Sequence, residues 1–276
     1  MTSPFVPGPR GSFSRYVAVG DSFTEGLWGD PDDEGRPTGW ADLLAAELST
    51  RRVACGEAPL EYANLAVRGR LLRPILTEQL PRALRMKPDL VSIVGGGNDV
   101  LRPATDVDVL ARNLEAAVVR AKNAGAEVLL ATGMDAKDSP LVRRTRTRTG
   151  ILNAHLWTIA RRHGAFVLDL WGMRSLRDWR MWAPDRIHLN AAGHQRVAQG
   201  ALAALGLDVD PEWDTPLPPA PPLSPLETAR WNATWAREWA IPWATRRLRR
   251  RSSGDSVTAK RPTLRAVDLP GPRAED

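Results

Sequence analysis

The sequence contains only one cysteine and four histidines among its 276 residues. A single cysteine, Cys55, excludes an intramolecular disulfide framework. One thiol and four imidazoles also leave little from which to build a zinc site. We therefore expect no metal and no other cofactor, so any hydrolytic chemistry must come from ordinary side chains.

Long apolar runs are also missing. No segment approaches the roughly 20 apolar residues that a membrane-spanning helix needs. The first 14 residues contain three prolines and two glycines, and they lack the basic start, apolar stretch and small-residue cleavage site of a signal peptide. These absences predict a cytoplasmic protein.

The formal charge of +6 is unevenly distributed. Residues 246–276 contain nine Lys and Arg against four Asp and Glu, which leaves 29 basic and 28 acidic residues in 1–245. Because the body of the chain is close to neutral, the net charge gives no reason to expect nucleic acid as its partner. Any argument for a polyanionic partner concerns the tail alone.

Short apolar runs alternate with helical patterns along most of the chain. Strands are expected at 16–20, 62–67, 90–94, 127–131 and 166–170. Helices are expected at 39–50, 71–84, 106–124, 150–163 and 191–205. This alternation predicts an α/β fold with a five-stranded parallel sheet that helices cover on both faces. In such sheets ligands bind beyond the carboxyl ends of the strands.

The composition changes after residue 207, where prolines become frequent. Ser224, Pro225 and Glu227 have the pattern of a capping box with proline in the first turn, which predicts a helix start. We divide the chain into a main domain, a Pro-rich connector, a Trp- and Arg-rich helix and a disordered basic tail. These parts span 15–207, 208–223, 224–251 and 252–276.

Tryptophan recurs at every fourth position of the expected C-terminal helix, and Pro242 should end or kink that helix. The residues are Trp231, Trp235, Trp239 and Trp243. We favour packing of this stripe onto the main domain, as a brace beside its core. The alternative is a weak contact of 224–251 with an anionic membrane, since six residues rich in arginine follow the stripe.

Candidate functional residues follow three of the expected strands. Ser22 lies in the Gly-Asp-Ser turn after the first strand, where a serine can present both its hydroxyl and its own N–H at the sheet edge. Gly69 follows the second strand and offers an unobstructed backbone N–H. Asn98 follows the third strand, with an amide that can point into a pocket. Each segment taken alone is also ordinary turn chemistry.

Asp185 and His188 lie three residues apart, just ahead of the helix expected at 191–205. In a turn, this spacing lets the carboxylate accept a hydrogen bond from one ring nitrogen, which fixes the tautomer and leaves the other nitrogen as a base. Four separate signals thus occur in order along the chain, each at the end of a strand or ahead of a helix. Their joint occurrence favours one shared site.

Residues 15–206 resemble the SGNH hydrolases, also called the GDSL esterase/lipase family, whose four sequence blocks supply Ser, Gly, Asn and His. In this chain those residues are Ser22, Gly69, Asn98 and His188. The resemblance implies a three-layer α/β/α sandwich of the flavodoxin-like type. It assigns no function to the chain beyond the shared blocks.

The mechanism that the resemblance implies is acyl transfer, with Ser22 as nucleophile, His188 as base and Asp185 orienting the imidazole. Charge developing on the carbonyl oxygen would be met by the backbone N–H groups of Ser22 and Gly69 and by the side-chain amide of Asn98. A water would then resolve the acyl-enzyme.

We therefore predict a carboxylic ester hydrolase that acts on a small-molecule ester or an acylated sugar. One alternative is a carbohydrate O-deacetylase or an acyltransferase that uses the same residues. A second is a non-catalytic binding protein that acts through its basic tail. The complete set of motif residues argues against the second alternative.

Four arginines follow the fourth expected strand, where substrate should bind. They predict either a solvated loop or a lid that attracts an anionic substrate. They are Arg143, Arg144, Arg146 and Arg148. Other polar residues near the motifs or within the helices are expected to be structural, and these are His155, His163, His194, Asp21 and Asp99.

Overall fold

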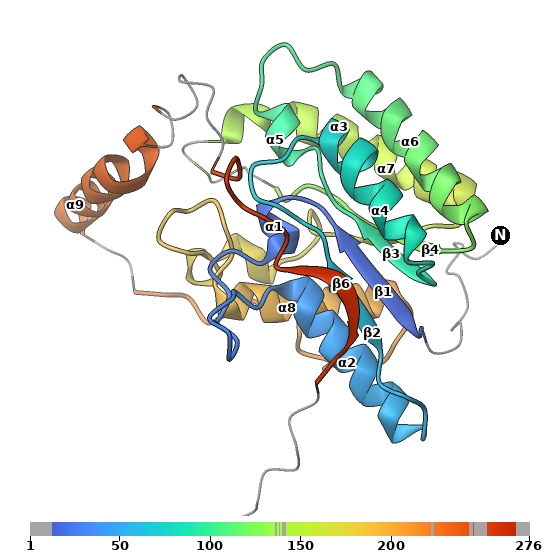
Figure 1. The fold of residues 1–276 in the computed structure, drawn as a ribbon. Coiled ribbons are helices and arrows are strands. Elements are labelled where there is room, and N and C mark those ends of the chain that lie inside the picture. The colour runs from blue at the N-terminus through green and yellow to red at the C-terminus, as the bar shows by residue number, and fades with distance from the viewer. Residues whose placement is uncertain are drawn as a thin grey trace, which may run out of the picture.

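A six-stranded, mostly parallel sheet forms the middle of the molecule (Figure 1). The computed structural model describes residues 13–135, 137, 139, 142–221, 224–242, 245 and 253–268. The five parallel strands are β1 (Arg15–Val19), β2 (Glu61–Asn64), β3 (Leu90–Ile93), β4 (Glu127–Ala131) and β5 (Phe166–Leu168). The strand order is β5-β4-β3-β1-β2-β6, with β6 (Arg261–Ala266) antiparallel to β2. All five expected strands are present.

Helices cover both faces of this sheet, which confirms the predicted three-layer α/β/α fold (Figure 1). One face is covered by α2 (Trp40–Ala54) and α8 (Ala191–Ala204). The other is covered by α3 (Leu72–Pro74), η1 (Ile75–Gln79), α4 (Leu80–Arg85), α6 (Val107–Asn123) and α7 (Arg146–His163). Shorter turns are α1 (Ser22–Glu25), α5 (Gly97–Val100), η2 (Arg143–Thr145), η3 (Ser175–Arg177) and η4 (Trp179–Met181). None of the helices in the described part of the chain has the length and apolar character needed to cross a membrane.

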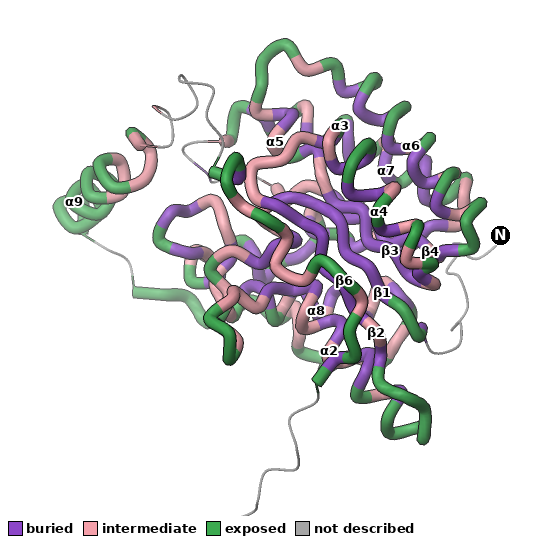
Figure 2. Tube along the Cα trace, in the orientation of Figure 1, coloured by how far each residue is buried: buried purple, intermediate pink, exposed green. Residues whose placement is uncertain are grey.

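The apolar core is divided in two by the sheet. Successive side chains of a strand point to opposite faces, so Tyr16 and Ala18 of β1 pack with α2 and α8, whereas Val17 and Val19 pack with the helices opposite. Figure 2 shows the central strands buried along their length. Burial on both faces explains why these strands have nearly continuous apolar sequences.

The C-terminal helix consists of α9 (Pro225–Trp235) and a π-helical segment, η5 (Ala236–Ala240). The predicted capping box is present: the Ser224 hydroxyl accepts a hydrogen bond from the Glu227 N–H, and the Glu227 carboxylate accepts one from the Ser224 N–H. The π-helical segment ends two residues before Pro242, which has no N–H to donate to a regular helix. Trp243 lies outside the described residues.

The expectation of disorder over 252–276 is wrong for the segment that forms β6, and the sheet therefore has six strands instead of five. Leu264 packs against the core cluster on one face of the sheet, whereas Val267 is buried in the cluster on the other. The Val267 N–H also donates to the Leu60 carbonyl at 2.8 Å. Composition alone indicated disorder because the segment has few apolar residues, and its order depends on the free edge of β2. Residues 269–276 lie outside the described part.

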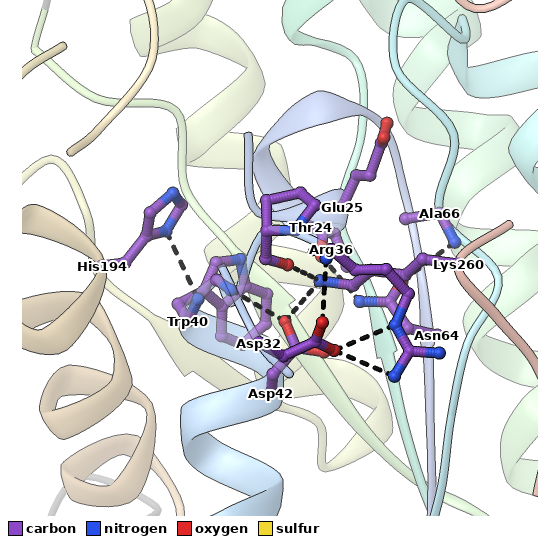
Figure 3. A network of polar contacts seen from close by, with 12 residues as sticks. Thr24, Glu25, Asp32, Arg36, Trp40, Asp42, Asn64, Ala66, His194 and Lys260 are labelled. Atoms are coloured by element: carbon purple, nitrogen blue, oxygen red, sulfur yellow. Dashed lines mark hydrogen bonds and ion pairs between the residues drawn. The ribbon is translucent and has the colours of Figure 1, made fainter. Parts of the chain in front are cut away.

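A nearly buried ion pair fastens this C-terminal segment to α2 (Figure 3). Lys260 Nζ lies 2.6 Å from Asp42 Oδ2, and the two side chains are only 10% and 18% exposed. The same carboxylate accepts hydrogen bonds from the Gly39 N–H at 2.8 Å and from the Tyr62 hydroxyl at 3.1 Å. Loss of the lysine would leave a poorly solvated carboxylate without its counter-ion.

We predict that Lys260→Ala lowers the free energy of unfolding by about 2 to 3 kcal/mol, because removing one partner of a buried ion pair leaves the other charge uncompensated. The matched control is Arg15→Ala, which breaks an ion pair with Glu61 whose side chains are 46% and 44% exposed. That change should cost less than about 1 kcal/mol. Urea unfolding measures both, and equal losses would contradict the prediction.

Candidate active site

Ser22 lies directly beyond the carboxyl end of β1, at the start of α1. The strand and the helix come so close that a Cβ at Gly20 would lie 2.5 Å from Thr24 Oγ1 and 2.8 Å from the Val94 carbonyl oxygen, so only glycine fits there. Asp21 then caps α1 with its carboxylate. The local sequence thus fixes the serine at the edge of the sheet where ligands bind.

Asp185 and His188 share a tight loop just ahead of α8. The Ala183 N–H donates to the His188 carbonyl at 2.9 Å, and the Arg186 N–H donates to the Ala183 carbonyl at the same distance. Within the loop, Asp185 Oδ1 accepts hydrogen bonds from the N–H groups of Ile187 and His188, both at 3.0 Å. These two backbone hydrogen bonds therefore orient the carboxylate independently of its contact with the imidazole.

A continuous hydrogen-bond chain joins three of the predicted site residues. His188 Nε2 lies 2.9 Å from Ser22 Oγ, and His188 Nδ1 lies 2.6 Å from Asp185 Oδ2. Burial opposes ionisation of Asp185, but the hydrogen bonds from His188, together with the positive charge of its ring when that ring is protonated, outweigh burial and hold the pKa of Asp185 below its usual value. An ionised Asp185 places the ring proton on Nδ1 and leaves Nε2 to accept the hydroxyl proton of Ser22.

Trp28 is a further partner of this carboxylate that the sequence analysis missed. Its indole N–H donates to Asp185 Oδ2 at 3.0 Å, the same oxygen that His188 contacts. Trp28 has a left-handed backbone with φ of +67°, which is uncommon for a bulky residue. No local pattern pointed to this contact, because the two residues are 157 positions apart in the sequence.

Asn98 and Gly69 come from the turns after β3 and β2. Asn98 Nδ2 donates to the Arg70 carbonyl at 3.0 Å and to Asp21 Oδ2 at 3.2 Å, so both amide hydrogens have acceptors. Gly69 has φ of +73°, which favours glycine in this turn. Asn98 therefore connects the turn that contains Gly69 with the residue that precedes Ser22.

An ion pair links α1 to the same turn. The Glu25 carboxylate, which is buried, accepts the Arg68 N–H at 2.6 Å and pairs with the Arg68 guanidinium. Since Ser22 and Glu25 are the first and last residues of α1, this pair fixes the serine relative to the residue before Gly69. The sequence offered no signal for it.

A largely apolar cavity of about 260 Å³ adjoins the hydrogen-bond chain. Ser22, Asn98 and His188 line it, whereas Gly69 is not among its lining residues. Apolar lining residues include Val94, Leu152, Leu156, Leu170 and Leu176. In the part of the chain that the structure describes, no group of three or more His, Cys, Asp or Glu side chains is arranged to hold a metal ion.

The other histidines have structural partners. His194 accepts the Trp40 N–H at Nδ1 (Figure 3). Its Nε2 donates to the Leu27 carbonyl. Burial lowers the pKa of His194 to about 4, so the ring is neutral at ordinary pH. His155 and His163 each pair with a carboxylate of α6 at 2.8 Å. These contacts agree with the structural roles expected for all three.

The arginine run lies at the start of α7 and in the turn before it. Arg146 pairs with Asp135 at 2.7 Å, and Arg148 donates to the Arg102 carbonyl at 2.6 Å. None of the four arginines lines the cavity, whose basic lining residues are Lys137, Arg177 and Arg186. The geometry therefore gives no support to the lid, and the run lies in two helical segments and not in the alternative that we expected, a solvated loop.

Asp21 provides a test of the electrostatics beside Ser22. Burial, to which the negative charge of Asp99 adds, raises the pKa of Asp21 to about 6, although a backbone hydrogen bond and the charge of His188 oppose it. An unfolded aspartate titrates near 3.9, so ionisation of Asp21 destabilises the native state. The destabilisation is absent below about pH 4 and complete above about pH 6.

We predict that Asp21→Asn, which can still cap α1, raises the free energy of unfolding at pH 8 by about 1 to 3 kcal/mol. The gain should disappear near pH 4, where the wild-type carboxyl is protonated in both states. Urea unfolding at the two pH values measures this difference. A gain of the same size at both would show that the carboxylate charge is not its source.

Several solved structures are similar to this chain in fold. An α/β-hydrolase from the metagenome of Lake Arreo, Spain (LAE5) is 27% identical, with a TM-score of 0.58, and the alignment covers 70% of this chain and 95% of that one. Axe2, an acetylxylan esterase from Geobacillus stearothermophilus, is 21% identical with a TM-score of 0.57, covering 73% and 98%. TesA is 23% identical with a TM-score of 0.53, covering 69% and 97%.

These structures confirm the fold, and no curated protein matches the chain. The family model of the GDSL-like lipases and acylhydrolases matches residues 18–196. That segment contains four of the five parallel strands in full, the last two residues of β1 and every residue of the hydrogen-bond chain. The chain therefore belongs to the GDSL-like lipase/acylhydrolase family.

Proposed function

We propose that this chain hydrolyses carboxylic esters through an acyl-enzyme formed on Ser22. The observation that carries the proposal is the hydrogen-bond chain from Ser22 through His188 to the buried Asp185, at 2.9 Å and 2.6 Å. A serine with a base in reach, and a base oriented by a third group, is the arrangement that activates a hydroxyl as a nucleophile.

The reaction proceeds in two steps, acylation of Ser22 and hydrolysis of the acyl-enzyme. Ser22 Oγ attacks the ester carbonyl carbon while His188 Nε2 takes the hydroxyl proton, and the Asp185 carboxylate stabilises the imidazolium. His188 then returns this proton to the leaving alcohol as its C–O bond breaks. A water molecule then gives a proton to His188 Nε2 as its oxygen attacks the acyl carbon. The bond from that carbon to Ser22 Oγ breaks, His188 returns the proton to Ser22 Oγ, and the acid leaves.

The donors that we propose for the oxyanion are the N–H groups of Ser22 and Gly69 and the side-chain amide of Asn98. In the free protein the amide hydrogens of Asn98 bond to the Arg70 carbonyl and to Asp21. In the proposed transition state, the Asn98 amide exchanges one of these bonds for a hydrogen bond to the developing oxyanion. The new hydrogen bond becomes stronger as the negative charge forms.

The cavity favours an acyl chain of several carbon atoms. A volume of about 260 Å³ is several times the roughly 30 Å³ that a water molecule occupies in the liquid, so an acetyl methyl group would leave most of it empty. Burying further methylene groups against leucine side chains contributes about 0.8 kcal/mol each. We therefore propose esters of medium-length acids as substrates, ahead of acetylated sugars.

Removal of Asn98 tests the oxyanion contact. We predict that Asn98→Ala lowers kcat by about a hundredfold, corresponding to about 3 kcal/mol of transition-state stabilisation, with little change in KM. The matched control is Asn123→Ala at the exposed end of α6, which should leave kcat unchanged. A loss confined to KM would exclude this role for Asn98.

A chain-length series of p-nitrophenyl esters, run beside acetylated sugars, tests the whole proposal. We expect kcat/KM to rise from acetate to medium-length chains, and Ser22→Ala and His188→Ala each to lose at least about a thousandfold. His155→Ala, which removes a half-exposed histidine on α7, is the control. Hydrolysis that survives Ser22→Ala would refute the serine mechanism, and a preference for acetylated sugars would indicate a deacetylase.

A further inference from the structure

The C-terminal helix, formed by α9 and η5, lies outside the segment that the family model matches. It has no buried residue, so it adds little to the apolar core. In Figure 1 it lies to one side of the sheet and its covering helices. Its side-chain contacts with the rest of the described chain are concentrated on Trp28 and on the loop that contains Asp185 and His188.

Two of these contacts act on Asp185, one directly at its backbone and one through Trp28 at its side chain. The indole N–H of Trp235 donates to the Asp185 carbonyl oxygen at 3.0 Å. The ring of Trp239 meets the ring of Trp28 edge to face, with centroids 5.4 Å apart. Trp28 in turn donates to Asp185 Oδ2. The helix therefore holds Asp185 directly at its backbone and, through Trp28, at its side chain.

Arg186 supplies the third contact. Its guanidinium lies 3.6 Å from the ring centre of Trp231 and 4.8 Å from that of Trp235, and Nη1 donates to Asn232 Oδ1 at 2.8 Å. Arg186 is 6% exposed, and its Nε and Nη2 atoms have no hydrogen-bond partner in the described part of the chain. Contact of the guanidinium with the faces of two indole rings is thus the main interaction that offsets the loss of hydration of its charge. The backbone φ of Arg186 is +58°, so the loop is strained at the residue that the helix contacts.

We infer that the C-terminal helix positions the acid–base loop for catalysis, with Trp28, Arg186 and Trp235 as positioning residues. The inference rests on the proposed function, since it assigns these residues to the orientation of Asp185 and His188. The tryptophan stripe then acts on the catalytic loop instead of bracing the core.

The Trp28 hydrogen bond should also affect how the pair titrates. Its indole N–H and the His188 ring share one carboxylate oxygen, so Trp28 withdraws negative charge from the side that faces the imidazole. Loss of the N–H should favour the imidazolium. Asp21, whose charge also acts on His188, and the neutral ring of His194 are unchanged in the variants proposed below.

The test compares Trp28→Phe and Trp235→Phe in the full chain, since both keep a six-membered aromatic ring and lose the five-membered ring that carries the N–H donor. We expect kcat to fall about tenfold and about threefold, respectively, with KM within about twofold of the wild type. In Trp28→Phe the acid limb of the kcat/KM profile should also move to higher pH by about half a unit. The control is Trp157→Phe, an exposed tryptophan on α7, which should behave as the wild type.

Arg186 is tested through its aromatic partner, which avoids altering the loop itself. Trp231→Leu should lower kcat several-fold and Trp231→Phe should largely restore it, because only the latter keeps an aromatic face for the guanidinium. Melting temperatures of all variants show whether a loss of rate merely follows a loss of fold.

Two results would overturn the inference. Unchanged kcat and pH profiles in both indole variants would mean that the helix does not position the loop. A loss confined to KM in Trp235→Phe would instead assign Trp235 to substrate binding, in the hollow of about 440 Å³ that it lines beside Trp179 and Trp182. NMR titration of the His188 ring in the wild type and Trp28→Phe is independent of turnover. It therefore tests the positioning even if Ser22→Ala shows that the proposed reaction is wrong.

Discussion

The position of β1 in the middle of the sheet is the constraint on which the site depends. Because β1 pairs in parallel with β2 on one side and β3 on the other, the turns after all three strands meet at one edge. Ser22, Gly69 and Asn98 follow these three strands, so all three come to the same edge of the sheet. With β1 at the edge of the sheet, it would have one neighbouring strand, and the turn after the other strand would no longer lie beside Ser22.

Much of this arrangement could be predicted because it depends on short-range patterns. The apolar runs gave the strands, and the three-residue spacing of Asp185 and His188 predicted the hydrogen bond that the structure contains. The carboxyl ends of neighbouring parallel strands lie at the same edge of the sheet. The remaining candidate residues could therefore be predicted from their positions directly after the strands. Their separation in sequence did not matter, because the sheet brings them together.

What could not be predicted depends on contacts between distant segments. Trp28 reaches Asp185 only through an unusual backbone conformation and a loop 157 residues away. Strand β6 has few apolar residues, and its order requires the free edge of β2 and the carboxylate that pairs with Lys260. The two C-terminal segments therefore have different roles in packing. Strand β6 extends the sheet and contributes to its core. The C-terminal helix has no buried residue and contacts Trp28 and the loop that contains Asp185.

The antiparallel addition of β6 also determines where the sheet stops. Without it, β2 would present a bare row of backbone N–H and C=O groups, which is a template for pairing with another chain. β6 covers that row and is itself a poor template, because Pro262 has no N–H and Arg261 and Arg265 place charge along the strand. Strand β6 therefore protects the protein against edge-to-edge aggregation, a property unrelated to catalysis that a truncation removing residues 261–266 would abolish.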